Sequence, residues 1–248
     1  MGIFNKIFGE KQCRIPADLS VLETDLHSHL IPGIDDGAKT LDDALVLVRE
    51  LHELGYKKLI TTPHVMSDYY QNSPETILSG LEKLKEGVIA ANIPVTIEAA
   101  AEYYIDEHFA SKIEKKELLT FAGNHVLIEL PFFNEPKNLN TEIFNLTISG
   151  YKVVLAHVER YTYWFHDFEN YEKLKDREVF FQLNLTSLYE DGKSHIRKIC
   201  EKLIDAGMIN FLGSDAHNPE HIEKIKKVLS NKHLKILIDS GKLLNKNL

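Results

Sequence analysis

Short apolar segments of strand length alternate with amphipathic segments of helix length along nearly the whole chain, and this alternation constrains the fold more than any other feature. Strands are predicted at 23–27, 58–62, 95–102, 125–130, 152–156, 179–184 and 209–213. Helices are predicted at 39–54, 73–91, 106–118, 141–150, 168–176, 194–206, 219–230 and 233–246. Because such an alternation produces parallel βα units, the sequence predicts an α/β fold built as a closed or nearly closed barrel of seven strands.

Two of the helix starts are specified by their capping residues. Thr40 precedes a first turn that holds Asp42 and Asp43, whose negative charge suits a helix N-terminus. Ser73 precedes Pro74, and proline is favoured at the first helical position.

The composition is that of an ordinary globular protein. Of the 248 residues, 44% are hydrophobic and 27% are charged, and no linker rich in Pro, Gly or Ser divides the chain. Residues 21–248 are therefore predicted to form a single domain, preceded by an N-terminal arm at 1–20. The net charge of −8 argues against nucleic-acid binding, which requires a positive surface.

Two further features bear on the compartment. Cys13 and Cys200 are too few for a disulfide framework, and this usage favours the reducing cytoplasm. The sequence contains no apolar run near the ~20 residues that a membrane-spanning helix needs, and the N-terminus does not read as a secretory signal. We expect a cytoplasmic protein without stable insertion into a membrane.

Histidine and acidic residues gather at the carboxyl ends of the predicted strands. His27 and His29 are two positions apart, so in a strand they point the same way, and Asp215 and His217 repeat that spacing. In a parallel barrel these ends lie on one face, where catalytic groups collect. The residues placed there are His27, His29, Asp36, His64, Glu102, Glu129, His157, Asp215 and His217, with Asp35 as an alternative to Asp36. The remaining histidines lack partner spacing and are interpreted as surface or packing residues.

Such a set points to bound metal ions. Four acids and five histidines at one end of a barrel would repel their own kind unless positive ions lay between them. Mixed imidazole and carboxylate ligands suit Mn²⁺, Fe or Zn²⁺ rather than Mg²⁺ or Ca²⁺. Clustered ions of this type generate hydroxide from water near neutral pH and stabilise in-line phosphoryl displacement.

A recognisable pattern of motifs runs through these residues, formed by His27-Ser28-His29, His64, Glu102, His157 and Asp215-Ala216-His217. It resembles the PHP (polymerase and histidinol phosphatase) family. Within that family, the segments 27–37, 101–104, 128–129 and 156–161 are similar to the bacterial tyrosine-protein phosphatases of capsule and exopolysaccharide operons. The similarity covers about residues 22–240 and implies a distorted seven-stranded (β/α)7 barrel with metal-dependent phosphoric monoester hydrolase activity toward phosphotyrosine.

The resemblance also implies a site for three metal ions, with Mn²⁺ favoured and Fe or Zn²⁺ as alternatives. By this resemblance the first ion is held by His27, His29, Glu102 and Asp215. Glu102 bridges to the second ion, which Glu129 and His157 complete. The third ion is held by Asp36, His64 and His217.

Arg160 is a predicted catalytic residue, together with Asp215 and His217. Metal-activated hydroxide is the expected nucleophile, and the guanidinium would neutralise charge on the phosphoryl oxygens. A surface ion pair with Glu159 or Asp167 is the alternative for Arg160. Members of the phosphatase group carry arginines where this chain has residues 65–68 and 218–220, none of which is arginine. Arg160 is therefore the main candidate for holding the phosphoryl group.

The expected substrate is a phosphotyrosine protein, namely the tail of a bacterial tyrosine kinase of capsular or exopolysaccharide synthesis or export. Leu19 and Ala206 occupy the sixth positions after the two cysteines, so neither begins a Cys-x5-Arg phosphate loop, and a thiol nucleophile is disfavoured. Two alternatives stay open, a phosphatase of a small phosphomonoester such as histidinol phosphate and a non-catalytic metal-bound scaffold. The aromatic residues in 161–165 either form a rim for an aromatic substrate or pack in the core.

Overall fold

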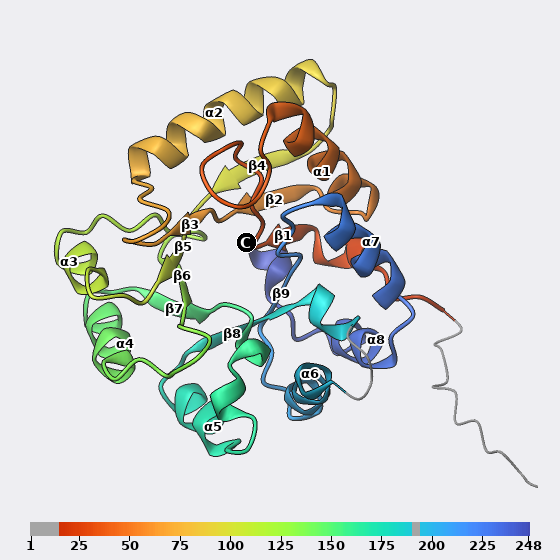
Figure 1. Cartoon of the computed structure of the whole chain (residues 1–248). Helices are drawn as coiled ribbons and strands as arrows, with labels where there is room; N and C mark the ends of the chain where they lie inside the picture. The colour runs from red at the N-terminus through yellow and green to blue at the C-terminus, as the bar shows by residue number, and fades with distance from the viewer. Residues whose placement is uncertain (1–14, 190–193) are drawn as a thin grey trace, which may run out of the picture.

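Parallel strands curl around a common axis with the helices on the outside (Figure 1). The computed structural model describes residues 15–189 and 194–248, so most of the predicted N-terminal arm lies outside the described residues. The strands are β1 Thr24–Leu26, β2 Lys58–Thr61, β3 His64–Val65, β4 Thr96–Ala99, β5 Glu102–Tyr104, β6 His125–Glu129, β7 Lys152–Leu155, β8 Phe180–Asn184 and β9 Phe211–Gly213. They form one sheet in the order β1-β2-β4 and another in the order β3-β5-β6-β7-β8-β9. Neighbouring strands pair in parallel, which confirms the predicted α/β fold with a parallel sheet.

The predicted count of seven strands is not confirmed, because the structure has a further short strand after each of two predicted strands. β2 covers most of the predicted segment 58–62, and β3 follows that segment; β4 lies within the predicted segment 95–102, and β5 begins at its last residue, Glu102. Pro63, between β2 and β3, has no backbone N–H to donate to a ladder. Its carbonyl oxygen accepts from Glu102 N at 3.1 Å, so the broken segments stay side by side. As a result β2 pairs with β1 and β4, whereas β3 pairs with β5.

The two sheets meet where the end of β1 lies beside the end of β9. Asp215 N donates to His27 O at 2.8 Å, and His29 N donates to Ala216 O at 3.0 Å. Gly213 permits this approach, because a Cβ there would lie 2.3 Å from Leu26 O. Two segments from opposite ends of the sequence, each with two predicted ligands, are therefore held side by side.

The helices pack around the strands. They are α1 Leu41–Glu53, α2 Pro74–Ala90, α3 Phe109–Glu114, α4 Leu139–Ile148, α5 Glu169–Asp176, α6 His195–Asp205, α7 Pro219–Val228 and α8 Lys232–Asp239. Thr40 and Ser73 cap α1 and α2 as predicted, each within a capping box. The last predicted helix is too long, because α8 is followed by a separate 3-10 turn at Asn245–Asn247. In the described ranges, none of the helices has the length and apolar character needed to cross a membrane.

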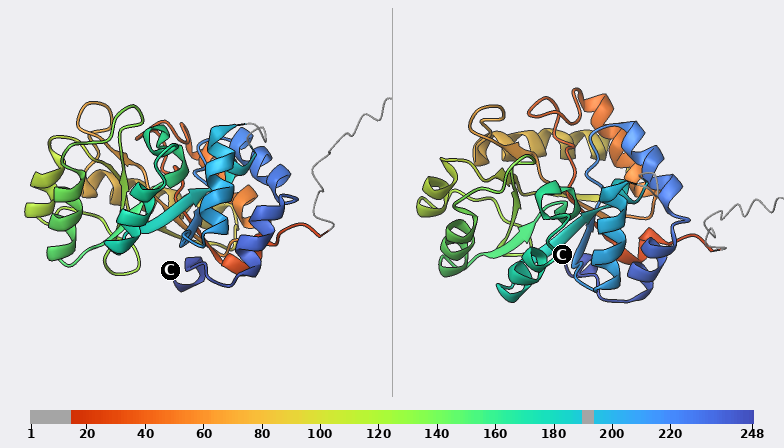
Figure 2. Two further views of the ribbon diagram at one scale, coloured as in Figure 1. Left: turned by 90° about the horizontal axis from the view of Figure 1, so that it is seen from below. Right: turned by 60° about the horizontal axis from the view of Figure 1, so that its bottom comes forward.

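The C-terminal segment lies near the centre of the ring in Figure 1 and at the lower edge of the left view in Figure 2. The space inside the strands is filled by an inner cluster of Leu26, Ile60, Ala100, Phe121, Leu127, Val154, Ala156 and Phe211. Leu244 and Leu248 pack against this inner cluster. The buried Asn245 donates to Thr24 O at 3.1 Å and to Leu212 O at 2.8 Å. Because Thr24 begins β1, the segment lies at the amino ends of the strands, opposite the predicted ligands.

Candidate metal centre

The predicted site residues converge on one cavity of about 320 Å³ at the carboxyl ends of the strands. His64 and Glu102 begin β3 and β5, and Glu129 ends β6. His27 and His29 follow β1 and are completely buried. The cavity is lined by Asp36, His64, Glu102, Glu129, Phe132, His157, Arg160, Asp215, His217, Asn218 and His221. The structure thus brings Arg160 and all of the predicted ligands together.

Glu102 lies at the centre of the cluster. Its Oε2 is 3.1 Å from both His27 Nε2 and His64 Nδ1, and its Oε1 is 3.0 Å from His157 Nε2. Burial raises the pKa of Glu102, but the charges of His27 and His64 outweigh burial and hold the pKa well below its usual range. This buried carboxylate therefore stays ionised between imidazole rings.

Asp215 forms a second centre beside Glu102. Its Oδ1 is 3.2 Å from His27 Nε2 and 3.3 Å from His29 Nε2. The same oxygen is 3.5 Å from His217 Nδ1. His27 and His29 thus face the same carboxylate, in agreement with their spacing of two residues.

The structure separates the positions of Asp35 and Asp36. The side chain of Asp35 is buried, its Oδ2 lies 2.7 Å from His29 Nδ1, and the same oxygen accepts from the backbone N–H of His64 at 3.1 Å. Asp36 is half-exposed, and its Oδ1 lies 3.3 Å from His217 Nε2 and 3.5 Å from His64 Nε2. The hydrogen bond from His217 lowers the pKa of Asp36 to about 2. Asp36 is therefore the acid that faces the cavity, whereas Asp35 holds the ring of His29.

Three of the predicted ligands have a strained backbone. The angle φ is +82° at His27, +29° at His157 and +48° at Asp215, on the positive side that residues other than glycine rarely adopt. Such a conformation costs on the order of 1–3 kcal/mol and persists only where the surrounding structure enforces it. Strained residues collect at functional sites, so the backbone is a second, independent sign that this cluster is functional.

The donor atoms fit divalent metal ions. They gather in four groups among the described residues, which are His29 with Asp36, His64 and His217; His27 with His29 and Asp215; His27 with Glu102 and His157; and His64 with Glu102 and Glu129. Two ligands bound to one ion at about 2.1 Å lie about 3.0 to 3.4 Å apart, which matches the distances from the acids to the imidazoles. His29 Nε2 and His64 Nδ1 are buried and make no hydrogen bond to the described residues, so both atoms are available as ligands.

Arg160 is directed toward the cavity. Its Nη1 is 3.5 Å from Asp215 Oδ2, and its guanidinium carbon lies 4.6 Å from the centre of the Phe132 ring. The carboxylate of Glu159 is buried and accepts from Ser187 Oγ at 2.7 Å. The structure therefore pairs Arg160 with Asp215 and not with its neighbour Glu159.

His221 also lines the cavity, a position that the sequence did not predict. Its Nδ1 lies 2.9 Å from Asp215 O, and its ring centre is 5.4 Å from that of His217. His217 precedes α7 and His221 lies in its first turn, so no regular period in the sequence predicts this contact.

The aromatic residues near the cavity divide into core and rim. Tyr161 and Trp164 are buried and belong to the core. Phe132 lines the cavity, and the ring of Tyr70 stacks on His64 with the centres 5.5 Å apart. The rim is therefore formed by aromatic residues outside the 161–165 segment.

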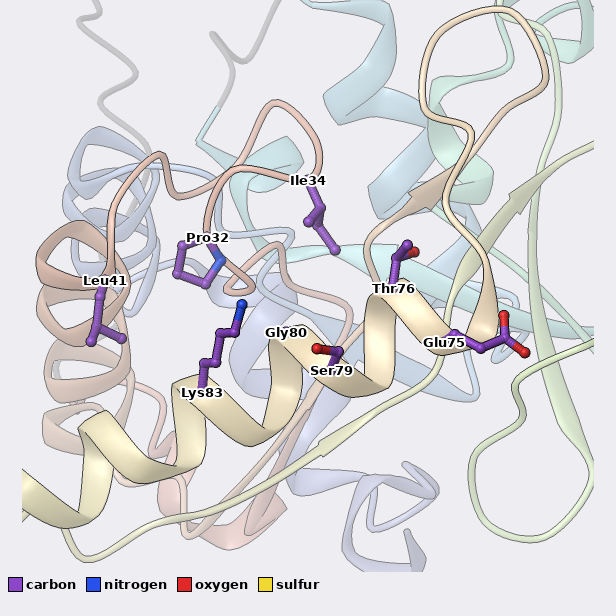
Figure 3. Close-up of a pocket in the computed structure, with 8 residues that line it drawn as sticks. All are labelled: Pro32, Ile34, Leu41, Glu75, Thr76, Ser79, Gly80 and Lys83. Atoms are coloured by element: carbon purple, nitrogen blue, oxygen red, sulfur yellow. The ribbon is translucent and has the colours of Figure 1, made fainter.

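A second hollow, of about 500 Å³, lies between α2 and the loop after β1 (Figure 3). Pro32 and Ile34 from the loop and Lys83 from α2 contribute to its wall. Gly80 allows α2 to approach the loop, because a Cβ there would lie 2.3 Å from Ile31 Cγ2. None of the predicted ligands lines this hollow, so it is separate from the candidate metal centre.

Comparison with known proteins identifies the family of this chain. The family model described as "Capsular polysaccharide synthesis, CpsB/CapC" matches residues 23–241. The tyrosine-protein phosphatase YwqE of Bacillus subtilis is 28% identical over 195 residues, which are 78% of this chain and 77% of that protein. The crystal structures of YwqE from Bacillus subtilis and CpsB from Streptococcus pneumoniae are described as those of unique metal-dependent tyrosine phosphatases. One chain of these crystal structures aligns with the present structure with a TM-score of 0.79 and 25% sequence identity. The alignment covers 90% of this chain and 94% of that one.

A more distant structure shares the fold. The histidinol phosphate phosphatase of Lactococcus lactis, solved with zinc, L-histidinol and phosphate, aligns with a TM-score of 0.53 and 16% identity, over 85% of this chain and 93% of that one. At this identity the likeness shows the fold alone. The match across 23–241 confirms the resemblance to the capsule phosphatases that the motifs indicated. The chain therefore belongs to the CpsB/CapC family of capsular polysaccharide synthesis.

Proposed function

We propose that this chain is a metal-dependent protein-tyrosine phosphatase that hydrolyses phosphotyrosine with a metal-activated hydroxide. The observation that carries the proposal is the single cavity in which imidazoles, carboxylates and Arg160 meet. The related tyrosine-protein phosphatases support the substrate class. The proposed partner is the tail of a tyrosine kinase of capsular or exopolysaccharide synthesis or export, and the proposed compartment is the cytoplasm.

Three ions are proposed, with Mn²⁺ preferred to Fe or Zn²⁺. The proposed ligands are His27, His29, Glu102 and Asp215 for the first ion, Glu102, Glu129 and His157 for the second, and Asp36, His64 and His217 for the third. His64 Nδ1 lies 3.1 Å from Glu102 Oε2, so this residue is also available to the second ion. When bound, the ions supply a hydroxide nucleophile near neutral pH and positive charge that offsets the phosphoryl oxygens.

The remaining cavity residues bind and orient the substrate. Arg160 presents its guanidinium beside Asp215, where two N–H groups can bind two phosphoryl oxygens. Phe132 offers an apolar wall on which the phenyl ring of phosphotyrosine can pack. Attack at phosphorus breaks its bond to the tyrosine oxygen, which leaves and takes a proton from solvent. The products are inorganic phosphate and the dephosphorylated protein.

The curled sheet is regarded in this proposal as a distorted seven-stranded (β/α)7 barrel of the PHP type, formed by residues 21–248. Two observations support that description. β2 with β3, and β4 with β5, are each one chain segment interrupted by two residues. The contact between the ends of β1 and β9 joins the two sheets.

Metal content and turnover measured on one purified preparation test the proposal. After loading with Mn²⁺ we expect three ions per chain by elemental analysis and hydrolysis of a phosphotyrosine peptide, both lost on chelation. Histidinol phosphate is assayed in parallel, and faster turnover of that substrate would overturn the proposed specificity. Loaded protein that hydrolyses neither substrate would identify a scaffold, and turnover by metal-free protein would exclude the mechanism.

A further inference from the structure

Two amide side chains on β8, Gln182 and Asn184, lie next to the metal centre although neither was predicted to belong to it. Both are buried. Gln182 Oε1 accepts from the backbone N–H of His157 at 2.8 Å and lies 3.0 Å from His27 Nδ1. Gln182 Nε2 donates to Asn184 Oδ1 at 2.8 Å, and Asn184 Nδ2 donates to Asp215 Oδ2 at 2.6 Å. The amide pair thus connects three of the proposed ligands.

The direction of these hydrogen bonds is fixed at both ends. The backbone N–H of His157 can only donate, so the atom of Gln182 that faces it is the oxygen. The carboxylate of Asp215 accepts, so the group of Asn184 that faces it is the NH₂. Each amide can therefore adopt only one of its two possible orientations, because exchanging its oxygen and nitrogen would break one of these hydrogen bonds.

This direction determines the tautomer of His27. The oxygen of Gln182 faces His27 Nδ1, so Nδ1 carries the hydrogen, and when the ring is neutral Nε2 keeps its lone pair. His27 Nε2 lies 3.1 Å from Glu102 Oε2 and 3.2 Å from Asp215 Oδ1. Three electron-rich atoms therefore face one another, which is favourable when a cation lies between them.

We propose that Gln182 and Asn184 are positioning residues for the metal centre. Gln182 fixes the tautomer of His27 that binds metal through Nε2, and Asn184 holds Asp215 Oδ2 so that Oδ1 faces the same ion. The inference rests on the proposed function in taking His27 and Asp215 as ligands. Hydrogen bonds that orient ligands in this way typically contribute roughly 10- to 100-fold to metal affinity.

The neighbouring strand accommodates the amide of Gln182. A Cβ at Gly213 would lie 2.6 Å from Gln182 Nε2 and 3.0 Å from His27 Cβ, so the missing side chain leaves room for both. An apolar residue in place of Gln182 would leave the His157 N–H and the His27 Nδ1–H as buried donors without this acceptor. The amide therefore satisfies donors that no aliphatic side chain can satisfy.

Histidine NMR of the whole chain loaded with Zn²⁺ tests the tautomer directly. Zn²⁺ alone is the probe, because it is diamagnetic and suits the same ligands. With ¹⁵N-labelled histidine, we expect His27 to carry its hydrogen on Nδ1 and to bind Zn²⁺ through Nε2. A hydrogen on Nε2 of His27 in the loaded protein would overturn the inference.

Two variants distinguish the contribution of Gln182 from that of Asn184. Gln182→Met has a similar length without the acceptor, and we expect roughly 10- to 100-fold weaker Zn²⁺ binding and loss of the single His27 tautomer. Asn184→Leu should weaken Zn²⁺ binding on the same scale but keep the hydrogen on His27 Nδ1, because the oxygen of Gln182 remains. If Gln182→Met fails to fold, Asn184→Leu and the NMR of the unaltered chain decide the question.

Asn245→Leu is the matched control, since Asn245 is a buried amide at the opposite end of the strands. It should lower the melting temperature without changing Zn²⁺ affinity. If the β8 variants weaken Zn²⁺ binding no more than this control, the amides are merely structural and the inference is wrong. Protein that binds Zn²⁺ through His27 Nε2 but hydrolyses no phosphotyrosine would overturn the proposed function and leave this inference standing.

Discussion

The guanidinium carbon of Arg160 lies 4.6 Å from the centre of the Phe132 ring. The ring supports the cation from one face, while the carboxylate of Asp215 attracts it from the edge. The side chain of Arg160 is 38% exposed, so it is held at the boundary between the cavity and solvent. That position suits a group that meets an incoming phosphoryl group.

Replacing Arg160 by lysine should lower kcat for a phosphotyrosine peptide by about 10²-fold, the scale of losing one transition-state donor. Lysine keeps the charge but loses the planar fork and the stacking on Phe132. Steady-state kinetics with elemental analysis check this, and metal content should not change. Arg49→Lys, at an exposed position of α1, is the control. Unchanged kinetics in Arg160→Lys would assign the phosphoryl contact to another residue.

Glu102→Gln should remove more metal than Asp36→Asn. Glu102 lies between imidazoles from segments that are far apart in the sequence, including those of His27 and His157. Neutralising this carboxylate should therefore weaken the binding of more than one ion. Asp36 lies at the exposed edge, and its loss should cost at most one ion. Elemental analysis after gel filtration measures the difference. Equal losses in the two variants would argue against a carboxylate shared between ions.

Metal-free protein should lose stability as the pH rises from 6.5 to about 10. Burial lowers the pKa of His157, but hydrogen bonds to Glu102 and Glu129 outweigh burial and raise the pKa to about 10, above the ordinary value of 6.5. A pKa that is raised by folding stabilises the protein fully below the unfolded value, and that contribution disappears as the pH passes through the folded value. Melting temperatures of chelator-treated protein across this range test the expectation. His157→Gln should reduce the dependence of the melting temperature on pH. An identical pH dependence in the variant and the unaltered protein would contradict the role of His157.

Chelation should abolish phosphotyrosine hydrolysis and Mn²⁺ should restore it, whereas replacing both cysteines should leave most of the activity. A thiolate enzyme forms a covalent phosphocysteine, but a metal-hydroxide enzyme needs no nucleophile from the protein. Cys200 is buried and Cys13 lies outside the described residues. The double variant Cys13→Ser with Cys200→Ala is therefore assayed together with its melting temperature. A folded, metal-loaded double variant without activity would indicate a thiol nucleophile.

Gly213→Ala should lower the free energy of unfolding by about 3 kcal/mol or more, the upper end of the cost of overpacking. The added Cβ would meet the backbone oxygen of Leu26 at 2.3 Å, and a backbone atom cannot move away as a side chain can. Gly87→Ala is the control, since its Cβ would meet the flexible side chain of Leu41 at 2.9 Å. Urea unfolding of both variants measures the two costs. Similar small losses would mean that β1 and β9 can separate easily.

The ends of the strands could be predicted from local patterns. His27 and His29, like Asp215 and His217, are two residues apart, and the two-residue period of a strand predicts that they share a face. They do face one cluster, but both pairs lie just beyond β1 and β9, and His27 and Asp215 have a positive φ, so the regular strand does not itself position them. The choice between Asp35 and Asp36 could not be made in this way, because an irregular loop has no period. It depends on the contact of Asp35 with the ring of His29, which only the folded loop creates.

Long-range packing determined what the sequence could not predict. Gln182 and Asn184 resemble ordinary polar residues at the end of a strand, yet their partners His27 and Asp215 are 155 and 31 positions away. The breaks in the strands at 62–63 and 100–101 likewise arise from how neighbouring segments pair, although Pro63 marks one of them. Hydrophobic periodicity reports which side of an element is buried and carries no information about such partners.

Leu244 and Leu248 pack on the inner cluster while Asn245 bonds to β1 and β9, so the described C-terminal segment closes the amino ends of the strands. Among the described residues that line the candidate metal centre, the side chains of Asp36 and Arg160 are 52% and 38% exposed, so the cavity reaches solvent at these two residues. In the proposed function, substrate would enter and phosphate would leave past these same residues. Under the proposed function, a phosphorylated tail bound there would shield the ions from chelators, and phosphate that has not yet departed would delay the next substrate.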